Sequence, residues 1–162
     1  MEEIPVPNVF RLGRLSILAA LIPLIAVAAV AGPALGADLT VRVDGLRSRD
    51  GLIHFGLYGE AGADDFPDAS ALLGGGRIPA HREPPVYVFR GLAPGKYAVS
   101  MFHDENGDGK FDTTWLGMPE EGYGFSNDVM GFLSAPSFAA ASVTLGTNNK
   151  TVTITVKYLT FW

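Results

Sequence analysis

Residues 151–158, Thr-Val-Thr-Ile-Thr-Val-Lys-Tyr, alternate strictly between polar and apolar side chains. In an extended chain Val152, Ile154 and Val156 point to one side and their polar neighbours point to the other. This period of two is typical of a strand with one packed face and one solvated face. Shorter stretches with the same period, or with a short apolar run, lie at 39–44, 53–58, 86–90, 97–102 and 141–145. Together they predict an all-β, antiparallel β-sandwich of about seven strands.

The composition of the 162-residue chain excludes several classes of protein. It has no cysteine, which excludes a disulfide framework, a thiol nucleophile and a cysteine-ligated metal site. Its 17 acidic residues exceed its 12 lysines and arginines, and the formal net charge is −5. Because proteins that bind nucleic acid normally carry a basic patch, this charge argues against a nucleic-acid partner.

The first 37 residues have the pattern of a targeting segment. Arg11 and Arg14 precede an uncharged run at 15–37, which is mainly Leu, Ile, Val and Ala and ends in Ala-Leu-Gly-Ala. The pattern predicts a signal helix at 1–37 that is cleaved, so that the sandwich domain at 38–162 is exported to the periplasm or the extracellular space. The alternative is an uncleaved anchor, since the run is long enough to span a bilayer, and only then would the protein contact a membrane.

Two long connections interrupt the predicted strands. Residues 59–85 are rich in loop-forming residues, and within them 67–73 predict one or two helical turns that stop at the three glycines 74–76. The second connection runs from Asp104 to about Pro136. A connection of that length in a small domain is usually functional or disordered, so it is the first place to look for a site.

The second connection opens with an oxygen-rich stretch, His-Asp-Glu-Asn-Gly-Asp-Gly-Lys-Phe-Asp at 103–112. Counted from the first aspartate, side-chain oxygens occupy positions one, three, five and nine, and a glycine stands at position six. This spacing matches the first nine positions of a calcium loop, in which alternate side chains converge on the ion and position seven offers its carbonyl. The predicted calcium ligands in this stretch are the side chains of Asp104, Asn106, Asp108 and Asp112 and the backbone carbonyl of Lys110.

The match to a calcium loop is incomplete. Position twelve, normally a bidentate glutamate, is Trp115, and the residues before the loop predict a strand rather than a helix. A closing carboxylate must come from Glu120, Glu121 or Asp128, and we favour Glu121. Between residues 104 and 128 seven acids face one lysine, so a divalent cation would relieve their mutual repulsion. The alternative is a solvated turn in which Asn-Gly and Asp-Gly make tight bends.

The loop and the segment after it resemble an exported bacterial family called domain of unknown function 2141. The matching stretches are 103–112, Gly-Met-Pro-Glu-Glu-Gly-Tyr-Gly-Phe-Ser-Asn at 117–127, the strand at Leu39, Gly-Leu-Ile at 51–53 and Leu-Ala-Pro-Gly-Lys-Tyr at 92–97. The resemblance implies a transthyretin-like or collagen-adhesin-B-like sandwich outside the cytoplasm, and it implies no established activity. At position 108 the family often has asparagine where this chain has aspartate, and both side chains carry an oxygen donor.

Other candidate residues carry less specific signals. His103 could be a ligand or a general base, or it could simply form hydrogen bonds at the end of a strand. A triad of His103, an aspartate and Ser126 rests on proximity in the sequence alone, because Ser126 lacks the glycine-flanked elbow of a hydrolase. His54 is expected on the exposed face of its strand and His81 in a loop, and three scattered histidines do not make a zinc site.

Aromatic residues gather around the acidic loop in the sequence. They would either pack the loop onto the sandwich or form a platform on which a ligand stacks. The residues are Trp115, Tyr123, Phe125, Phe132 and Phe138. Phe111, at position eight of the loop, would anchor it to the core.

The sequence therefore predicts an exported β-sandwich that binds one structural calcium ion and acts as a binding or envelope-associated module. Its partner would be an unknown ligand or an envelope component. The alternatives are a secreted hydrolase that uses the region of His103 and its neighbouring carboxylates, and a purely structural envelope protein. The residues favour a protein without catalytic activity, and they assign no catalytic or cofactor-binding side chain.

Overall fold

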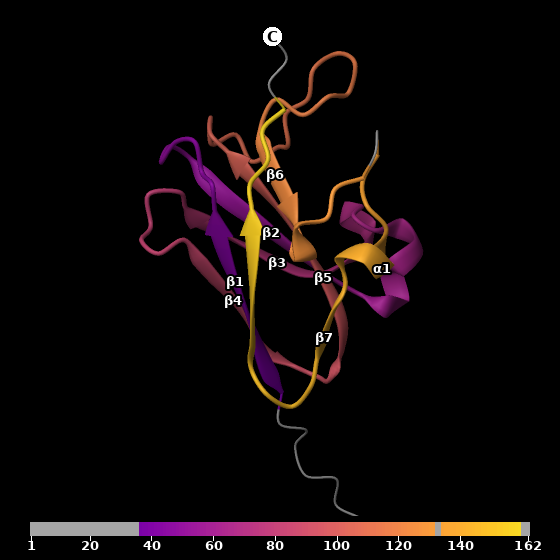
Figure 1. Ribbon diagram of the computed structural model, residues 1–162. Coiled ribbons are helices and arrows are strands. Elements are labelled where there is room, and N and C mark those ends of the chain that lie inside the picture. Colours follow the sequence, from indigo (N-terminus) through magenta and orange to yellow (C-terminus); the bar gives the residue numbers. More distant parts are fainter. Residues whose placement is uncertain (1–35, 132–133, 160–162) are drawn as a thin grey trace, which may run out of the picture. The chain divides into compact units, whose positions relative to one another are not determined.

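The computed structural model describes residues 36–131 and 134–159, and its strands form two sheets (Figure 1). The strands are β1 Ala37–Asp44, β2 Leu52–Gly59, β3 Leu72–Pro79, β4 Val86–Leu92, β5 Gly95–Asp104, β6 Gly122–Phe125, β7 Val143–Leu145 and β8 Lys150–Thr155. One sheet has the order β4-β1-β8. The other has the order β3-β2-β5-β6, and β7 also pairs with β5. The prediction of an all-β sandwich is confirmed. The predicted signal segment lies almost entirely outside the described residues.

The core lies between the two sheets, as the alternating patterns predict. On β1 the side chains of Leu39, Val41 and Val43 are buried, and on β8 Ile154 is buried as well. These residues pack with buried side chains of the larger sheet, which are Ile53, Phe55 and Leu57 of β2 and Val99 and Met101 of β5. Burial of each large aliphatic side chain stabilises the fold by about 1.5–3 kcal/mol. The intervening residues of β2 and β5 are thereby directed to the outer face of the larger sheet.

One strand pair differs from the predicted antiparallel arrangement. β1 and β8 run parallel, with Val41 beside Val152. The physical reason is the turn at 146–149, which joins β7 in the larger sheet to β8 in the smaller one. The chain therefore changes sheets at this turn instead of closing a hairpin.

Both long connections contain a strand that the sequence did not predict. In the first, a short 3₁₀ helix, η2 (Ala69–Ala71), agrees with the predicted helical turn. However, the glycines at 74–76 lie inside β3, where they pair with Phe55–Leu57 of β2. In the second connection, β6 pairs with residues 100–103 of β5. Together these strands extend the larger sheet on both sides of β2 and β5.

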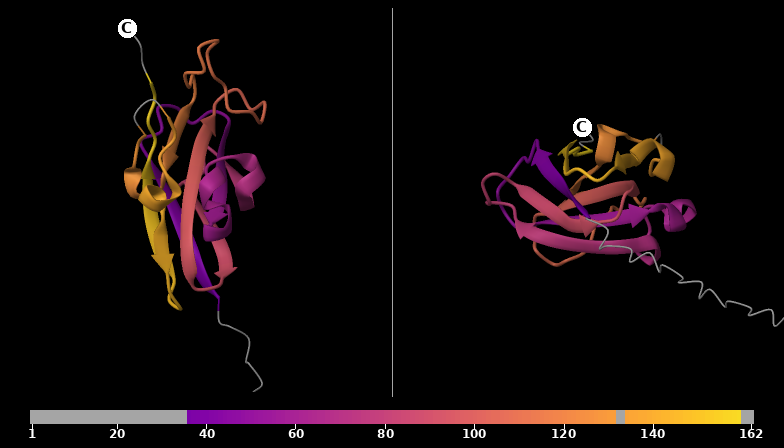
Figure 2. Two further views of the ribbon diagram at one scale, coloured as in Figure 1. Left: turned by 90° about the vertical axis from the view of Figure 1, so that its right-hand side faces the viewer. Right: turned by 90° about the horizontal axis from the view of Figure 1, so that it is seen from below.

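The outer face of the larger sheet is covered at one end. There Tyr58, Ala98 and Phe125 form a second apolar cluster with Phe138 of the helix α1 (Phe138–Ala141) and with Phe66, which follows the 3₁₀ helix η1 (Glu60–Asp65). A third 3₁₀ helix, η3, spans Ser126–Asp128. The acidic loop leaves β5 at the end opposite the turn between β7 and β8 (Figures 1 and 2). Between the second cluster and the acidic loop, the sheet presents the site described below.

Candidate functional site

Asp104, the last residue of β5, organises the acidic loop from a fully buried position. Its Oδ1 accepts hydrogen bonds from the backbone N–H groups of Gly107 (2.6 Å) and Asp108 (3.2 Å). Its Oδ2 accepts from the N–H of Gly109 (2.9 Å) and lies 3.0 Å from Nε2 of His54. Burial raises the pKa of this carboxyl, but the hydrogen bonds from the two glycines and His54 outweigh burial and hold the pKa below its usual range. Asp104 is therefore an ionised, buried anchor.

The following residues fold back on one another through side-chain-to-backbone hydrogen bonds at alternate positions. The side-chain Oδ1 of Asn106 accepts from the N–H of Asp108 at 2.9 Å, and Oδ1 of Asp108 accepts from the N–H of Lys110 at 2.8 Å. Gly107 and Gly109 adopt φ of 76° and 81°, which glycine reaches without strain. These residues thus form successive tight turns, in which the side-chain oxygen of every second residue accepts a hydrogen bond from the backbone.

Glu121 binds the acidic loop from across its base. Its carboxylate accepts from the N–H of Glu105 and from the N–H of Asp112, each at 3.2 Å, and the side chain is almost fully buried. Burial raises the pKa of Glu121, and the nearby charges of Asp104 and Asp112 raise it further. The ionised form of this carboxylate is therefore destabilised where it lies.

The other two candidates for the closing carboxylate lie elsewhere. Glu120 is exposed, and Asp128 accepts hydrogen bonds from the backbone N–H (2.6 Å) and the hydroxyl (3.1 Å) of Thr155. Glu105, inside the loop, forms an ion pair with Arg47 that lowers the pKa of Glu105. Glu121 is thus the acid among these that faces the loop backbone without a cationic partner.

The donor set fits a hard cation in its chemistry, because its ligand atoms are all oxygens. The six predicted residues Asp104, Asn106, Asp108, Lys110, Asp112 and Glu121 are linked by the hydrogen bonds above and by one from Asn106 Nδ2 to Asp112 Oδ2 (2.7 Å). In the described ranges no group of three or more His, Cys, Asp or Glu side chains is already arranged around a common metal position. The oxygens of these residues are therefore engaged in hydrogen bonds and are not gathered around one point.

His103 has a structural role in this geometry. It is fully buried, with Nδ1 at 2.7 Å from the hydroxyl of Tyr158 and Nε2 at 2.9 Å from the carbonyl of Asp50. Ser126 is also fully buried, and its hydroxyl donates to the carbonyl of Ala141. The hypothetical triad of His103, an aspartate and Ser126 is therefore not formed.

The histidine that does pair with an aspartate is His54, which the sequence placed only on an exposed face. Its ring stacks on Phe102, with centroids 4.5 Å apart and planes at 9°. Its partner in register on β5 is also Phe102, and Asp104 follows two residues later on the same face. Because the register of β2 on β5 brings His54 and Asp104 together, the sequence pattern alone could not reveal this pair.

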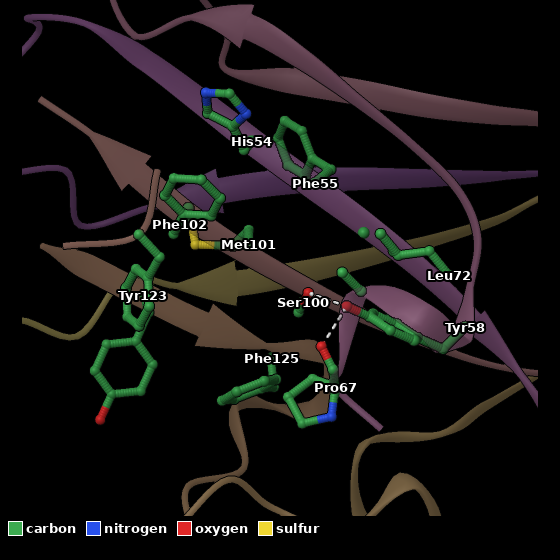
Figure 3. Close-up of a pocket in the computed structure, with 13 residues that line it drawn as sticks. His54, Phe55, Tyr58, Pro67, Leu72, Ser100, Met101, Phe102, Tyr123 and Phe125 are labelled. Carbon is green, nitrogen blue, oxygen red and sulfur yellow. Dashed lines mark hydrogen bonds between the residues drawn. The ribbon is translucent and has the colours of Figure 1, made fainter. Parts of the chain in front are cut away.

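A pocket of about 400 Å³ opens on this outer face, beside the acidic loop (Figure 3). His54 and Phe102 lie at one end, while Tyr58, Ser100 and Pro67 lie at the other. The hydroxyl of Tyr58 donates to the carbonyl of Pro67 at 2.7 Å. The other lining residues are Phe55, Gly56, Ala69, Leu72, Met101, Phe111, Tyr123 and Phe125. The pocket therefore has aromatic and aliphatic walls with a few polar groups, as small-molecule sites commonly do.

Residues 41–153 match the model of a family described as uncharacterised proteins conserved in bacteria, DUF2141. The chain belongs to this family. The match confirms the resemblance carried by the acidic loop, and it includes both that loop and the pocket. No curated protein and no solved structure matches the chain. Among the residues described, no helix combines the length and hydrophobicity needed to cross a membrane.

The aromatic residues of this DUF2141 chain divide into three groups. Tyr123 and Phe125 line the pocket, as does Phe111, which is partly exposed and contacts Phe102 and Tyr123 edge-on. Phe138 packs in the second apolar cluster, and Trp115 is 91% exposed. Phe132 lies outside the described residues. The expected single aromatic group around the loop is thus replaced by a pocket wall, a cluster residue and an isolated tryptophan.

Proposed function

We propose that this protein is an exported binding module whose acidic loop holds one calcium ion. The observation that carries the proposal is the environment of Glu121. This carboxylate is 5% exposed, its pKa is raised by burial and by Asp104 and Asp112, and it receives only backbone N–H groups. A divalent cation is the partner that would favour the ionised form of all three acids.

The ion would be held by oxygens alone. Side chains of Asp104, Asn106, Asp108, Asp112 and Glu121 and the carbonyl of Lys110 supply enough donors for calcium, which takes six to eight oxygen ligands. Its role would be to order the loop by compensating the charge on its acids. Extracellular modules bind calcium at about 0.1–1 mM, and a tenfold excess over the dissociation constant adds about 1.4 kcal/mol of stability by linkage.

Export is part of the proposal. The support is the basic, then apolar, then small-residue pattern of residues 1–37. Mass spectrometry of the protein recovered from an expressing bacterium tests it. We expect a mature N-terminus near residue 38, outside the cytoplasm. A full-length chain retained inside the cell would contradict export.

Calcium binding is tested by titration calorimetry of the metal-stripped protein. A second test is thermal unfolding with chelator and with about 5 mM calcium, a concentration above the expected dissociation constant. We expect heat on calcium addition and a higher unfolding temperature with calcium. Glu121→Gln should abolish most of this response. Glu120→Gln, the same substitution at the exposed neighbouring position, is the matched control and should retain it. The absence of heat with wild-type protein would refute the metal site.

A further inference from the structure

The outer-face pocket is separate from the proposed calcium ligands, although it adjoins them. Its floor is made of small residues where β2 meets β5, namely Gly56 beside Ser100. A Cβ at Gly56 would lie 2.8 Å from Leu72 Cδ2 and 3.0 Å from Ser100 Oγ. A side chain at this position would therefore collide with Leu72 and Ser100, so glycine lets these residues pack closely over the strand.

The walls of the pocket are flat rings. Phe102 lies stacked on His54, and Phe111 contacts both Phe102 and Tyr123 edge-on at centroid distances of 5.6 and 6.0 Å. Phe102, Phe111 and Tyr123 all retain exposed surface. A ligand with a flat aromatic body could stack or pack edge-on against them, which is the geometry that aromatic rings prefer.

A cationic side chain beside one end of the pocket favours an anion. Nε2 of His54 is hydrogen-bonded to Oδ2 of Asp104, and Nδ1 of His54 has no hydrogen-bond partner among the described residues. Arg77 of β3 stands opposite His54 in register, so its side chain extends from the same face of the sheet. Arg77 is exposed and makes no ion pair within the described part of the chain.

The nearby aspartate does not reverse this preference. Both oxygens of Asp104 are already occupied, by three backbone N–H groups and by His54. These donors partly compensate its negative charge inside the protein. The positively charged guanidinium of Arg77 has no such partner within residues 36–131 and 134–159, so it is available to a ligand.

We propose that this pocket binds a small aromatic carboxylate, with its ring system between Phe102, Phe111 and Tyr123 and its carboxylate toward Arg77. This inference goes beyond the proposed calcium site. The carboxylate would accept charge-assisted hydrogen bonds from the guanidinium of Arg77. The bound rings would cover apolar surface that now faces solvent.

Titration calorimetry with 2-naphthoate tests the proposal, with 2-naphthamide as its uncharged counterpart and decanoate as a carboxylate without rings. We expect a dissociation constant on the order of 10–100 μM for naphthoate. Naphthamide should bind about tenfold more weakly, because it lacks the charge-assisted contacts. Equal affinities for naphthoate and naphthamide, or tighter binding of decanoate, would overturn the assigned ligand class.

Variants locate the site. Arg77→Gln should lower the affinity for naphthoate to that for naphthamide. The affinity for naphthamide should not change. Arg42→Gln, at an exposed strand position of the other sheet, is the matched control and should change neither. Ala69→Trp places an indole at the mouth of the pocket from an exposed position and should weaken both ligands about tenfold or more. A folded Ala69→Trp protein with wild-type affinity would show that binding occurs elsewhere.

The same titrations in calcium and in chelator separate this inference from the calcium proposal. Naphthoate binding without any calcium heat would support the pocket and refute the metal site. Calcium heat without naphthoate binding would support the metal site and refute the pocket.

Discussion

His103 and Asp104 are neighbours at the end of β5, and both are fully buried, but they serve opposite faces of the sheet. His103 points inward, where both ring nitrogens are satisfied, by Tyr158 and by the Asp50 carbonyl. Asp104 points outward, and its hydrogen bonds lead to His54 and to a loop of acids. The inner network is closed, whereas the outer one ends at groups that a ligand or an ion can still engage. Burial therefore does not distinguish the structural residue from the site residue, because it is equal for both. The partners of their hydrogen bonds do distinguish them.

The largest expected effect tests the outer network. Asp104→Asn replaces a carboxylate that accepts three backbone N–H groups, and its amide NH₂ would oppose two donors. We expect a loss of about 3 kcal/mol in the free energy of unfolding, measured by urea denaturation in chelator, and no calcium response. Because the folded-state pKa of Asp104 is lowered, its stabilising effect is present above the unfolded pKa and is lost as pH falls through the folded value. A variant as stable as wild type would show that the loop does not depend on this anchor.

The inner network should give a smaller loss and no functional change. His103→Leu removes two buried hydrogen bonds and leaves the Tyr158 hydroxyl bonded only to the N–H of Arg47 among the described residues, so we expect a loss of about 2 kcal/mol. Calcium and naphthoate affinities, measured well below the unfolding temperature, should stay within about twofold of wild type. A larger change in either affinity would mean that the two faces are coupled through β5.

The sequence predicted more of the loop than of the pocket, for a physical reason. The spacing of Asp104, Asn106 and Asp108 is local, because side chains two residues apart bond to nearby N–H groups, and the turns follow from it. The pairing of His54 with Asp104 spans 50 residues and depends on strand register, which alternation does not specify. The alternating pattern indicated on which face of the sheet His54 lies, but it did not indicate that Asp104 lies beside it.

Strand β3 was missed for a related reason. Three consecutive glycines normally end an element, and here they pair with β2 instead. A Cβ at Gly76 would lie 2.1 Å from the Tyr87 hydroxyl, so a tertiary contact with β4 requires glycine at this position. That requirement involves a residue on another strand and leaves no trace in the local pattern.

A third prediction concerns the pH dependence of Glu121. The folded-state pKa of Glu121 is raised, so its protonation stabilises the fold below the unfolded pKa, and this contribution is lost as pH rises through the folded value. In chelator, wild-type protein should therefore lose stability relative to Glu121→Gln as pH rises from about 4.5 toward neutrality. Urea denaturation of both proteins across that range measures the difference. A difference that is constant with pH would show that Glu121 titrates as an ordinary surface acid.

The smallest effect is expected at Trp115, although it lies in the acidic loop and is its largest side chain. Because Trp115 is 91% exposed and absent from the pocket lining, Trp115→Ala should change the free energy of unfolding by no more than about 0.5 kcal/mol and leave naphthoate affinity unchanged. Phe111→Ala is the contrasting variant, because Phe111 contacts two pocket rings, and it should weaken naphthoate several-fold. If Trp115→Ala weakened the ligand as much as Phe111→Ala, the loop would have to fold over the pocket when ligand binds. The outer network would then reach further along the loop than Phe111.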